Sequence, residues 1–306
     1  MNLRNDTRGA TYVEFLLAFI PVFFLFLGMI QAGLLYTANL VVTHAASTAA
    51  RAAIVVLPDD PRAYGDEPTN QIGGGGSGGS SDPVSDFLSS FGLGGGAGPA
   101  ATAGRGGQRL NAIRAAASLP LLAVSPSLGQ LTGDPNVYRA VGGNPAERAA
   151  TGAALYNRTA MAVTFPSSPS ARTFRSSWSN DGLVTVRVTY MFHCGIPLVA
   201  RLMCDDYFSL VSGVPTAALR DLATGAASGA DASDMASLVR RVRIAEERVS
   251  RAQPRMRELD YAEIPWLGAL TLLTGSRFII LQAEATLPNH GAPYVYRGDM
   301  LGGGGG

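Results

Sequence analysis

The chain of 306 residues is poor in charge, histidine and cysteine, and it contains no lysine. Charged residues make up 15% of it and the formal net charge is +1, so the total implies neither a nucleic-acid surface nor a strongly acidic one. All 24 basic residues are arginine, a bias that we attribute to genomic base composition more than to mechanism. The three histidines form no Ser/His/Asp or Cys/His set by spacing. The sequence therefore predicts no catalytic site and no cofactor.

One long stretch near the N-terminus lacks charge altogether. Residues 15–36 are predominantly apolar, and no charged residue occurs between Glu14 and Arg51. As a helix this run is long enough to cross a hydrocarbon core of ~30 Å, and it exceeds the ~7–15 apolar residues of a secretory signal. Only the alanine-rich residues 45–53 offer weak cleavage matches after it. Because Arg4 and Arg8 precede the run, the positive-inside rule places the N-terminus in the cytoplasm and the bulk of the chain outside the inner membrane.

The same helix is expected to continue beyond the membrane. Residues 38–56 are rich in alanine and other small residues, which favour helix formation and close helix packing, and no breaker occurs before Pro58. We therefore expect one helix from about residue 11 to about residue 56. Pro21 removes a backbone donor and predicts a kink, although proline is also common in membrane helices without a functional role.

Glu14 is the one acidic residue at the edge of the apolar run, just after the small-residue junction Gly9–Ala10. A carboxylate at a bilayer edge is costly unless it has a partner. Two interpretations follow. Glu14 is a snorkelling carboxylate of a plain signal anchor, or it is kept because a positively charged partner meets it there.

The rest of the chain predicts a small antiparallel sheet with accessory helices. The clearest strand is 183–194, where apolar and polar residues alternate as in a half-buried strand. Two more strands are expected at 160–165 and 277–287, and the sheet is expected to pack on the outer half of the long helix. Helices are expected at 109–122, where Pro120 ends the helix, and at 146–154, 196–203 and 232–257, with an apolar helix or loop at 266–273.

A glycine- and serine-rich tract separates the long helix from these elements. Residues 72–107 carry too little apolar surface to offset chain entropy, so the region 58–108 is expected to be a flexible linker. Residues 75–79 match G-x-S-x-G only through glycine repetition, because no strand and helix flank them as that catalytic turn requires. The glycine-rich tail 297–306 is also expected to be disordered.

The two cysteines, Cys194 and Cys204, lie at either end of the expected helix 196–203. In an oxidising compartment they are expected to form a disulfide, worth on the order of 2–3 kcal/mol for a loop of this size. In a cytosolic protein they would be ordinary buried thiols. A zinc site is the remaining alternative, although the paired C-x-x-C spacing is missing. Its ligands would be His193, Cys194, Cys204 and Asp205 or Asp206, two aspartates that otherwise suit a solvated turn.

The helix expected at 232–257 is rich in arginine and carries a narrow apolar stripe. The simpler interpretation is a solvated amphipathic helix. The alternative is an element that docks on a protein or on a membrane surface, because arginine-rich faces suit anionic headgroups.

The N-terminal residues RGATYVEFLLAFIP, with the later segment THAASTAARAA, resemble the TadE-like pseudopilins of the tight-adherence (Flp) pilus system, and Gly9–Ala10 resembles a type IV prepilin processing site. The resemblance implies that a prepilin peptidase cuts between Gly9 and Ala10 on the cytoplasmic side. It further implies that Glu14 pairs with the new N-terminal amine, its own or a neighbour's. On this basis the chain divides into a leader (1–9), a transmembrane and extended helix (10–57), the linker, a periplasmic domain (109–296) and the tail.

The fold class expected is α+β, with a long pilin-like helix whose first half spans the membrane. The function expected is that of a non-catalytic minor pseudopilin in assembly or anchoring of a tight-adherence pilus. Expected partners are the prepilin peptidase, other pilins or pseudopilins, the inner-membrane assembly platform and membrane lipid. The alternative is an uncleaved signal-anchor protein with an adhesin-like binding domain outside the membrane. A membrane-anchored hydrolase has only the repeat-derived motifs in its favour.

Overall fold

A computed structural model of the chain describes residues 8–72, 107–132, 152–154, 156–157, 159–171, 173–180, 182–256, 258–259 and 274–289, without the side chains of residues 8–13, 128, 132, 197 and 256. The leader before residue 8, residues 73–106 of the glycine-rich tract, most of the expected helix 146–154, the segment 266–273 and the tail 297–306 lie outside the described residues.

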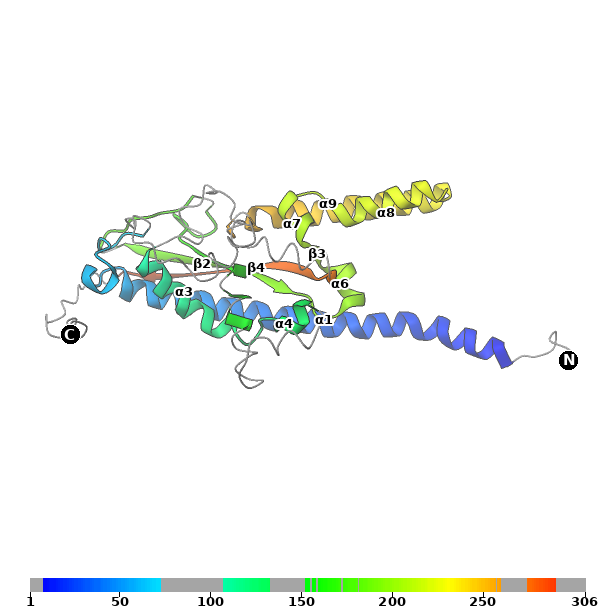
Figure 1. Ribbon diagram of the computed structural model, residues 1–306, viewed down its shortest axis with the longest axis horizontal. Coiled ribbons are helices and arrows are strands. Elements are labelled where there is room, and N and C mark those ends of the chain that lie inside the picture. Colours follow the sequence, from blue (N-terminus) through cyan, green and yellow to red (C-terminus); the bar gives the residue numbers. More distant parts are fainter. Residues whose placement is uncertain are drawn as a thin grey trace.

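The described elements form an α+β fold along one long helix (Figure 1). They are α1 (Arg8–Val56), η2 (Pro61–Tyr64), α3 (Gln108–Leu121), α4 (Leu128–Thr132), β1 (Met161–Thr164), β2 (Leu183–His193), α6 (Pro197–Met203), β3 (Asp205–Asp206), α7 (Tyr207–Ser212), α8 (Thr216–Ala227), α9 (Ala232–Met256) and β4 (Arg277–Pro288).

The C-terminal half of α1 forms one wall of the core. Six of its alanines and Val42 are completely buried, and these short side chains let α1 lie close to α3 on one side and to β2 and β4 on another; the alanines are Ala38, Ala45, Ala46, Ala49, Ala50 and Ala53. The prediction of one continuous helix ending at residue 56 is confirmed. The helix predicted at 109–122 is confirmed as α3, which ends at Leu121, one residue after Pro120.

The sheet has the strand order β1-β2-β4-β3, and neighbouring strands are antiparallel. β2 and β4 pair along their whole length, from Leu183 opposite Pro288 to His193 opposite Phe278. The three predicted strands and their packing on α1 are confirmed. The two-residue strand β3, which pairs with the start of β4, is an addition that the sequence pattern does not predict.

The prediction that the strand at 183–194 is half-buried is wrong, since both of its faces are covered. Val186, Val188 and Tyr190 belong to the core beside α1 and α3. On the opposite face, Arg187 and Thr189 are buried as well, under Glu258. Apolar and polar residues alternate along this strand because one face meets the apolar core and the other meets a polar layer that includes Glu258.

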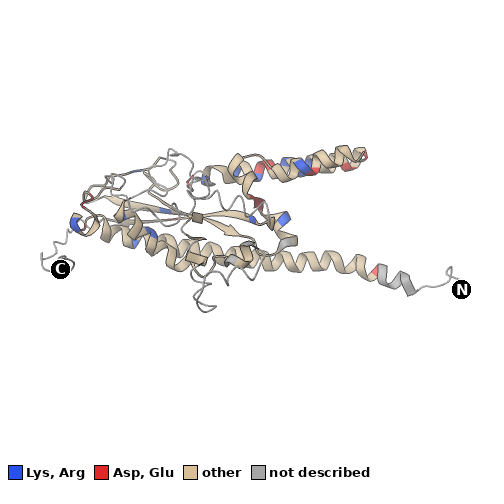
Figure 2. Cartoon of the chain, viewed as in Figure 1, with Lys and Arg blue, Asp and Glu red and all other residues tan. Residues whose placement is uncertain are grey.

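A helical hairpin, made by α8 and α9, stands on the other side of the sheet from α1 (Figure 1). The predicted arginine-rich helix is confirmed as α9, whereas α8 lies in a segment for which no helix is predicted. α1 carries no charged residue between Glu14 and Arg51, and Figure 2 shows charged residues along the hairpin.

Candidate functional site

The N-terminal half of α1 leaves the fold as an apolar rod. From Glu14 to Phe26 every residue is exposed, with Leu17 at 70% and Phe15 at 61%, whereas Ala38 and Ala45 are at 0%. We call residues 14–30 the apolar overhang; at ~1.5 Å per residue it is about 25 Å long. Among the described residues, α1 is the helix long and apolar enough to cross a membrane, by length and composition alone. The exposed surface of this rod is apolar on all sides, which is consistent with a membrane anchor.

One side of the overhang carries a column of aromatic rings. Phe15 stacks on Phe19, and Phe19 on Phe23, with ring centroids 5.4 and 5.6 Å apart. This i,i+4 column is absent from the sequence prediction, although its spacing is readable as one face of a helix. Pro21 lies inside α1 and supplies no N–H for the carbonyl of Leu17. The missing hydrogen bond is the reason to expect a kink, and the kink itself remains a prediction.

The residues of the expected processing site lie at the start of α1. Gly9 and Ala10 belong to its first turn, and the side chain of Glu14 is exposed. Ala10 and Glu14 are four residues apart in a helix and therefore share one face. An amine created at Ala10 would thus lie on the same face as the Glu14 carboxylate.

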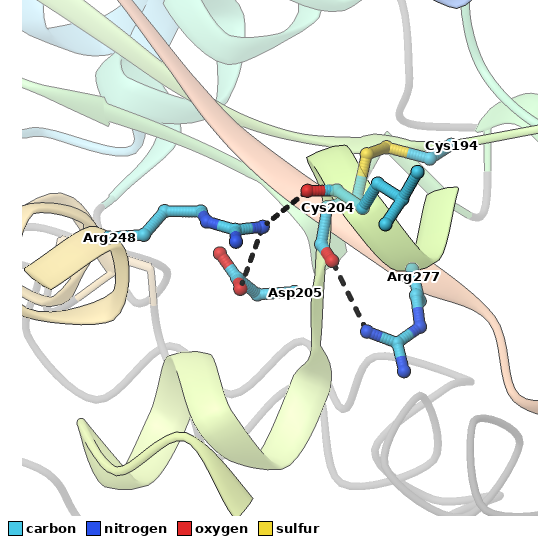
Figure 3. The surroundings of a disulfide bond; sticks show 6 residues. Cys194, Cys204, Asp205, Arg248 and Arg277 are labelled. Carbon is cyan, nitrogen blue, oxygen red and sulfur yellow. Dashed lines mark hydrogen bonds and ion pairs between the residues drawn. A yellow bond between two sulfur atoms is a disulfide. The ribbon is translucent and has the colours of Figure 1, made fainter. Parts of the chain in front are cut away.

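The disulfide end of the sheet is a second, separate location. Cys194 and Cys204 form a disulfide that closes the loop containing α6 (Figure 3). Both sulfur atoms are used in this bond, so the alternative of a zinc site with thiolate ligands is wrong. α6 contacts α1, which places the disulfide loop beside the part of α1 that leaves the fold.

Two arginines hold the chain around this loop (Figure 3). Arg277 Nη1 donates to the Cys204 carbonyl at 3.3 Å. Arg248 Nη1 donates to the Leu202 carbonyl at 3.1 Å and lies 3.5 Å from Asp205 Oδ1. Arg248 thereby fastens α9 to the end of the sheet, a contact that no sequence pattern indicates.

Asp205 and Asp206 are not solvated turn residues, and that prediction is wrong. Asp205 is 8% exposed, and burial raises the pKa of its carboxyl group. Asp206 caps α7, because its carboxylate accepts from the Ser209 N–H at 3.0 Å and from Thr216 Oγ1 at 2.9 Å. Their role in the described structure is to join β3, α7 and α8.

A buried ion-pair network lies on the outer face of the sheet. Arg187 is 4% exposed and pairs with Glu258 and Glu284, each at 2.7 Å. Glu258 also accepts from Thr189 Oγ1 at 2.8 Å and from Gln282 Nε2 at 3.0 Å. Because Glu258 follows α9 directly, the network ties the base of the hairpin to the middle of the sheet. The sequence pattern shows Arg187 only as one polar position of an alternating strand and gives no sign of its ion pairs.

Arg109 forms the third polar anchor, at the C-terminus of α1. It is completely buried, and burial lowers the pKa of its guanidinium. It donates to the carbonyls of Val56 and Leu57 at the end of α1, and to those of Asp59 and Glu67 at 2.9 and 3.1 Å. The positive charge stabilises the carbonyl end of a 49-residue helix.

The predicted site residues therefore fall into two groups that the structure does not bring together. Gly9, Ala10, Glu14 and Pro21 lie on the free end of α1, and the cysteine pair lies where α1 joins the sheet. The described residues include no group of three or more histidine, cysteine or carboxylate side chains that could hold a metal ion.

The comparisons with known proteins concern the same part of the molecule. The family model described as TadE-like protein matches residues 9–51. No curated protein and no solved structure matches the chain. The match begins at Gly9 and ends within the packed half of α1, so it covers the apolar overhang and excludes the sheet and the hairpin. Residues 9–51 of this chain are a TadE-like domain.

Proposed function

We propose that the chain is a non-catalytic minor pseudopilin that acts in assembly or anchoring of a tight-adherence (Flp) pilus. The TadE-like match suggests a role in Tad pilus assembly, and it coincides with the one helix whose outer half is exposed and apolar. That coincidence carries the proposal. The family is generally non-catalytic, and assembly through an apolar helix requires no catalytic group on this chain.

In this proposal a prepilin peptidase cuts the Gly9–Ala10 bond on the cytoplasmic side of the inner membrane. The new Ala10 amine pairs with Glu14 of the same chain or of a neighbour, which offsets the cost of holding a carboxylate at the membrane edge. The overhang then packs laterally against pilins, pseudopilins or the assembly platform, and Glu14 fixes the register of that packing.

The corresponding topology has a cytoplasmic N-terminus, one membrane span and a periplasmic α+β domain. The disulfide supports this side assignment, because disulfides persist in the oxidising periplasm and are rare in the cytosol. Membrane lipid and the pilus-assembly proteins are the partners that this topology requires.

Processing is tested by N-terminal sequencing and intact mass of the chain extracted from membranes of cells with and without a prepilin peptidase. We expect the chain to begin at Ala10 only when the peptidase is active. Gly9→Val is expected to abolish the cut because a branched side chain replaces the small junction residue. A chain that keeps residues 1–9 in peptidase-positive cells would favour the uncleaved signal anchor instead.

The role of Glu14 is tested separately by crosslinking in intact membranes. Glu14→Gln removes the charge but keeps the size, and we expect it to reduce crosslinked complexes with pilus proteins while processing continues. Glu246→Gln removes an exposed glutamate from α9 and serves as the matched control. Equal crosslinking by both variants would contradict the pairing of Glu14 with an amine.

A further inference from the structure

The α8–α9 hairpin and the apolar overhang are two arms that leave the fold in the same direction (Figure 1). Glu258, just after α9, contacts Thr189 in the middle of the sheet, and Arg248 contacts Asp205 at the disulfide end. The remaining part of α9, residues 232–247, therefore extends past that end by ~24 Å at ~1.5 Å per residue. The overhang has about the same length, so the two arms reach similar distances from the sheet.

Both arms cannot lie in one bilayer in this arrangement. A hydrocarbon core that surrounds residues 14–30 would also surround the outer part of the hairpin, which carries Asp234, Arg240, Arg241 and Arg243. Charged side chains are strongly unfavourable in hydrocarbon unless they are paired, and the described residues contain no ion pair with these three arginines. Insertion of α1 consequently requires the hairpin to lie elsewhere.

The exposed side of α9 has the composition of a helix that lies on a membrane surface. Arg240, Arg243, Arg251 and Arg255 recur at intervals that place them on one helical face, and all four are exposed; we call this set the basic stripe. Glu247 is the one acidic residue among them, and it pairs with Arg251. Ile244, on the same face, is 54% exposed and supplies an apolar contact. Basic residues with interspersed apolar ones suit anionic headgroups.

We propose that the hairpin lies on the anionic headgroups of the membrane that α1 enters, with the basic stripe against the lipid phosphates. The proposal rests on α1 crossing a bilayer and is independent of the pilus role. In this state the outer hairpin is turned away from α1, so its charges stay in the polar interface while the overhang occupies the hydrocarbon.

The attachments of the hairpin allow this movement. α8 has no buried residue, and Val249 is the single buried residue of α9 among those whose side chains the structure describes. The Arg248–Asp205 contact is partly exposed and long, at 3.5 Å, so the movement gives up this contact and the hydrogen bond from Arg248 to the Leu202 carbonyl. Glu258 receives several hydrogen bonds and remains the fixed point at the base. At the other end, Gly213 with φ of 74° precedes α8 and joins it to α7.

The test uses the full chain in lipid nanodiscs with a nitroxide label on single added cysteines. Ala236→Cys reports the depth of the stripe face of α9, and Leu25→Cys reports the overhang; power-saturation EPR with oxygen and a nickel chelate measures each depth. In discs with equal parts phosphatidylcholine and phosphatidylglycerol, we expect residue 236 at headgroup depth and residue 25 in hydrocarbon. In phosphatidylcholine alone, residue 236 is expected in water.

Charge variants identify the contact. R240Q/R243Q is expected to return the label at residue 236 to water in anionic discs, whereas R51Q/R175Q, with the same change in net charge at two exposed arginines elsewhere, is expected to leave it at the headgroups. A label in water or in hydrocarbon in anionic discs would overturn the proposal, as would indifference to R240Q/R243Q. A hydrophilic depth for residue 25 overturns the membrane anchor on which the proposal rests. Processing at Gly9 is measured independently, so the two failures are distinguishable.

Discussion

At the scale of single residues, one buried charge lies where the longest helix ends. Arg109 meets four backbone carbonyls, and its guanidinium lies 4.7 Å from the centre of the Tyr64 ring. The change Arg109→Met fills similar volume but leaves those carbonyls without their donor, and we expect a loss of about 2–4 kcal/mol in the free energy of unfolding. Urea denaturation measures it. Arg62→Met, at a half-exposed ion pair, is the control and should cost much less.

His193 should make the stability of the domain depend on pH. Burial lowers its pKa to about 4, and its ring packs edge-on to Phe278. The unfolded chain, with a pKa near 6.5, takes up the proton first as pH falls, so this contribution is complete above about pH 6.5 and is lost progressively down to about pH 4. The loss is on the order of 2–3 kcal/mol.

Urea midpoints between pH 7.5 and pH 4 check this dependence, with His193→Phe as the comparison because phenylalanine keeps the ring. The raised pKa of Asp205 acts with the opposite sign, since the folded chain there binds the proton more readily. A wild-type slope equal to that of His193→Phe would show that His193 does not control the response.

At the scale of elements, the loop that contains α6 is held to the end of β2 by the Cys194–Cys204 disulfide. Reduction of Cys194–Cys204 releases α6 from the end of β2, and we expect a loss of roughly 2–3 kcal/mol in unfolding free energy. The measurement is denaturation with and without dithiothreitol. The variant C194A/C204A should be insensitive to the reductant; if the wild type is equally insensitive, the loop contributes no stability.

Sequence patterns predict some of these elements and miss others. α1, β2, β4 and α9 follow from long apolar or alternating runs, because each has a period that its own residues reveal. β3 is two residues long, too short to show a period, and α8 buries no residue in the core. The two-sided burial of β2 depends on Glu258, a residue far along the chain whose approach no local pattern encodes. For the candidate site, the sequence locates Gly9, Glu14 and the cysteine pair but not the arginine anchors.

At the scale of the whole molecule, the overhang and the folded body should be thermodynamically independent. No residue from 14 to 26 is buried. A chain that begins at Gly28 is therefore expected to keep its melting temperature within about 2 °C, because larger losses of stability usually require the loss of buried contacts. It should also elute as a monomer without detergent. Differential scanning calorimetry and size-exclusion chromatography measure both, and a large drop in melting temperature would mean that the overhang supports the fold.

Under the proposed topology, in which the sheet is exported, the strand order also has a consequence for the time course of export. β4 lies between β2 and β3 in the sheet, yet it is the last of the four strands to be synthesised. Until it has crossed the membrane, β2 has an open edge and the alanine face of α1 has lost one of its two sheet partners. Contacts between residues this far apart in sequence form slowly. In the proposed topology, the chain spends the interval between translocation of β2 and arrival of β4 as an incomplete sheet, and during that interval periplasmic proteases and chaperones would have access to it.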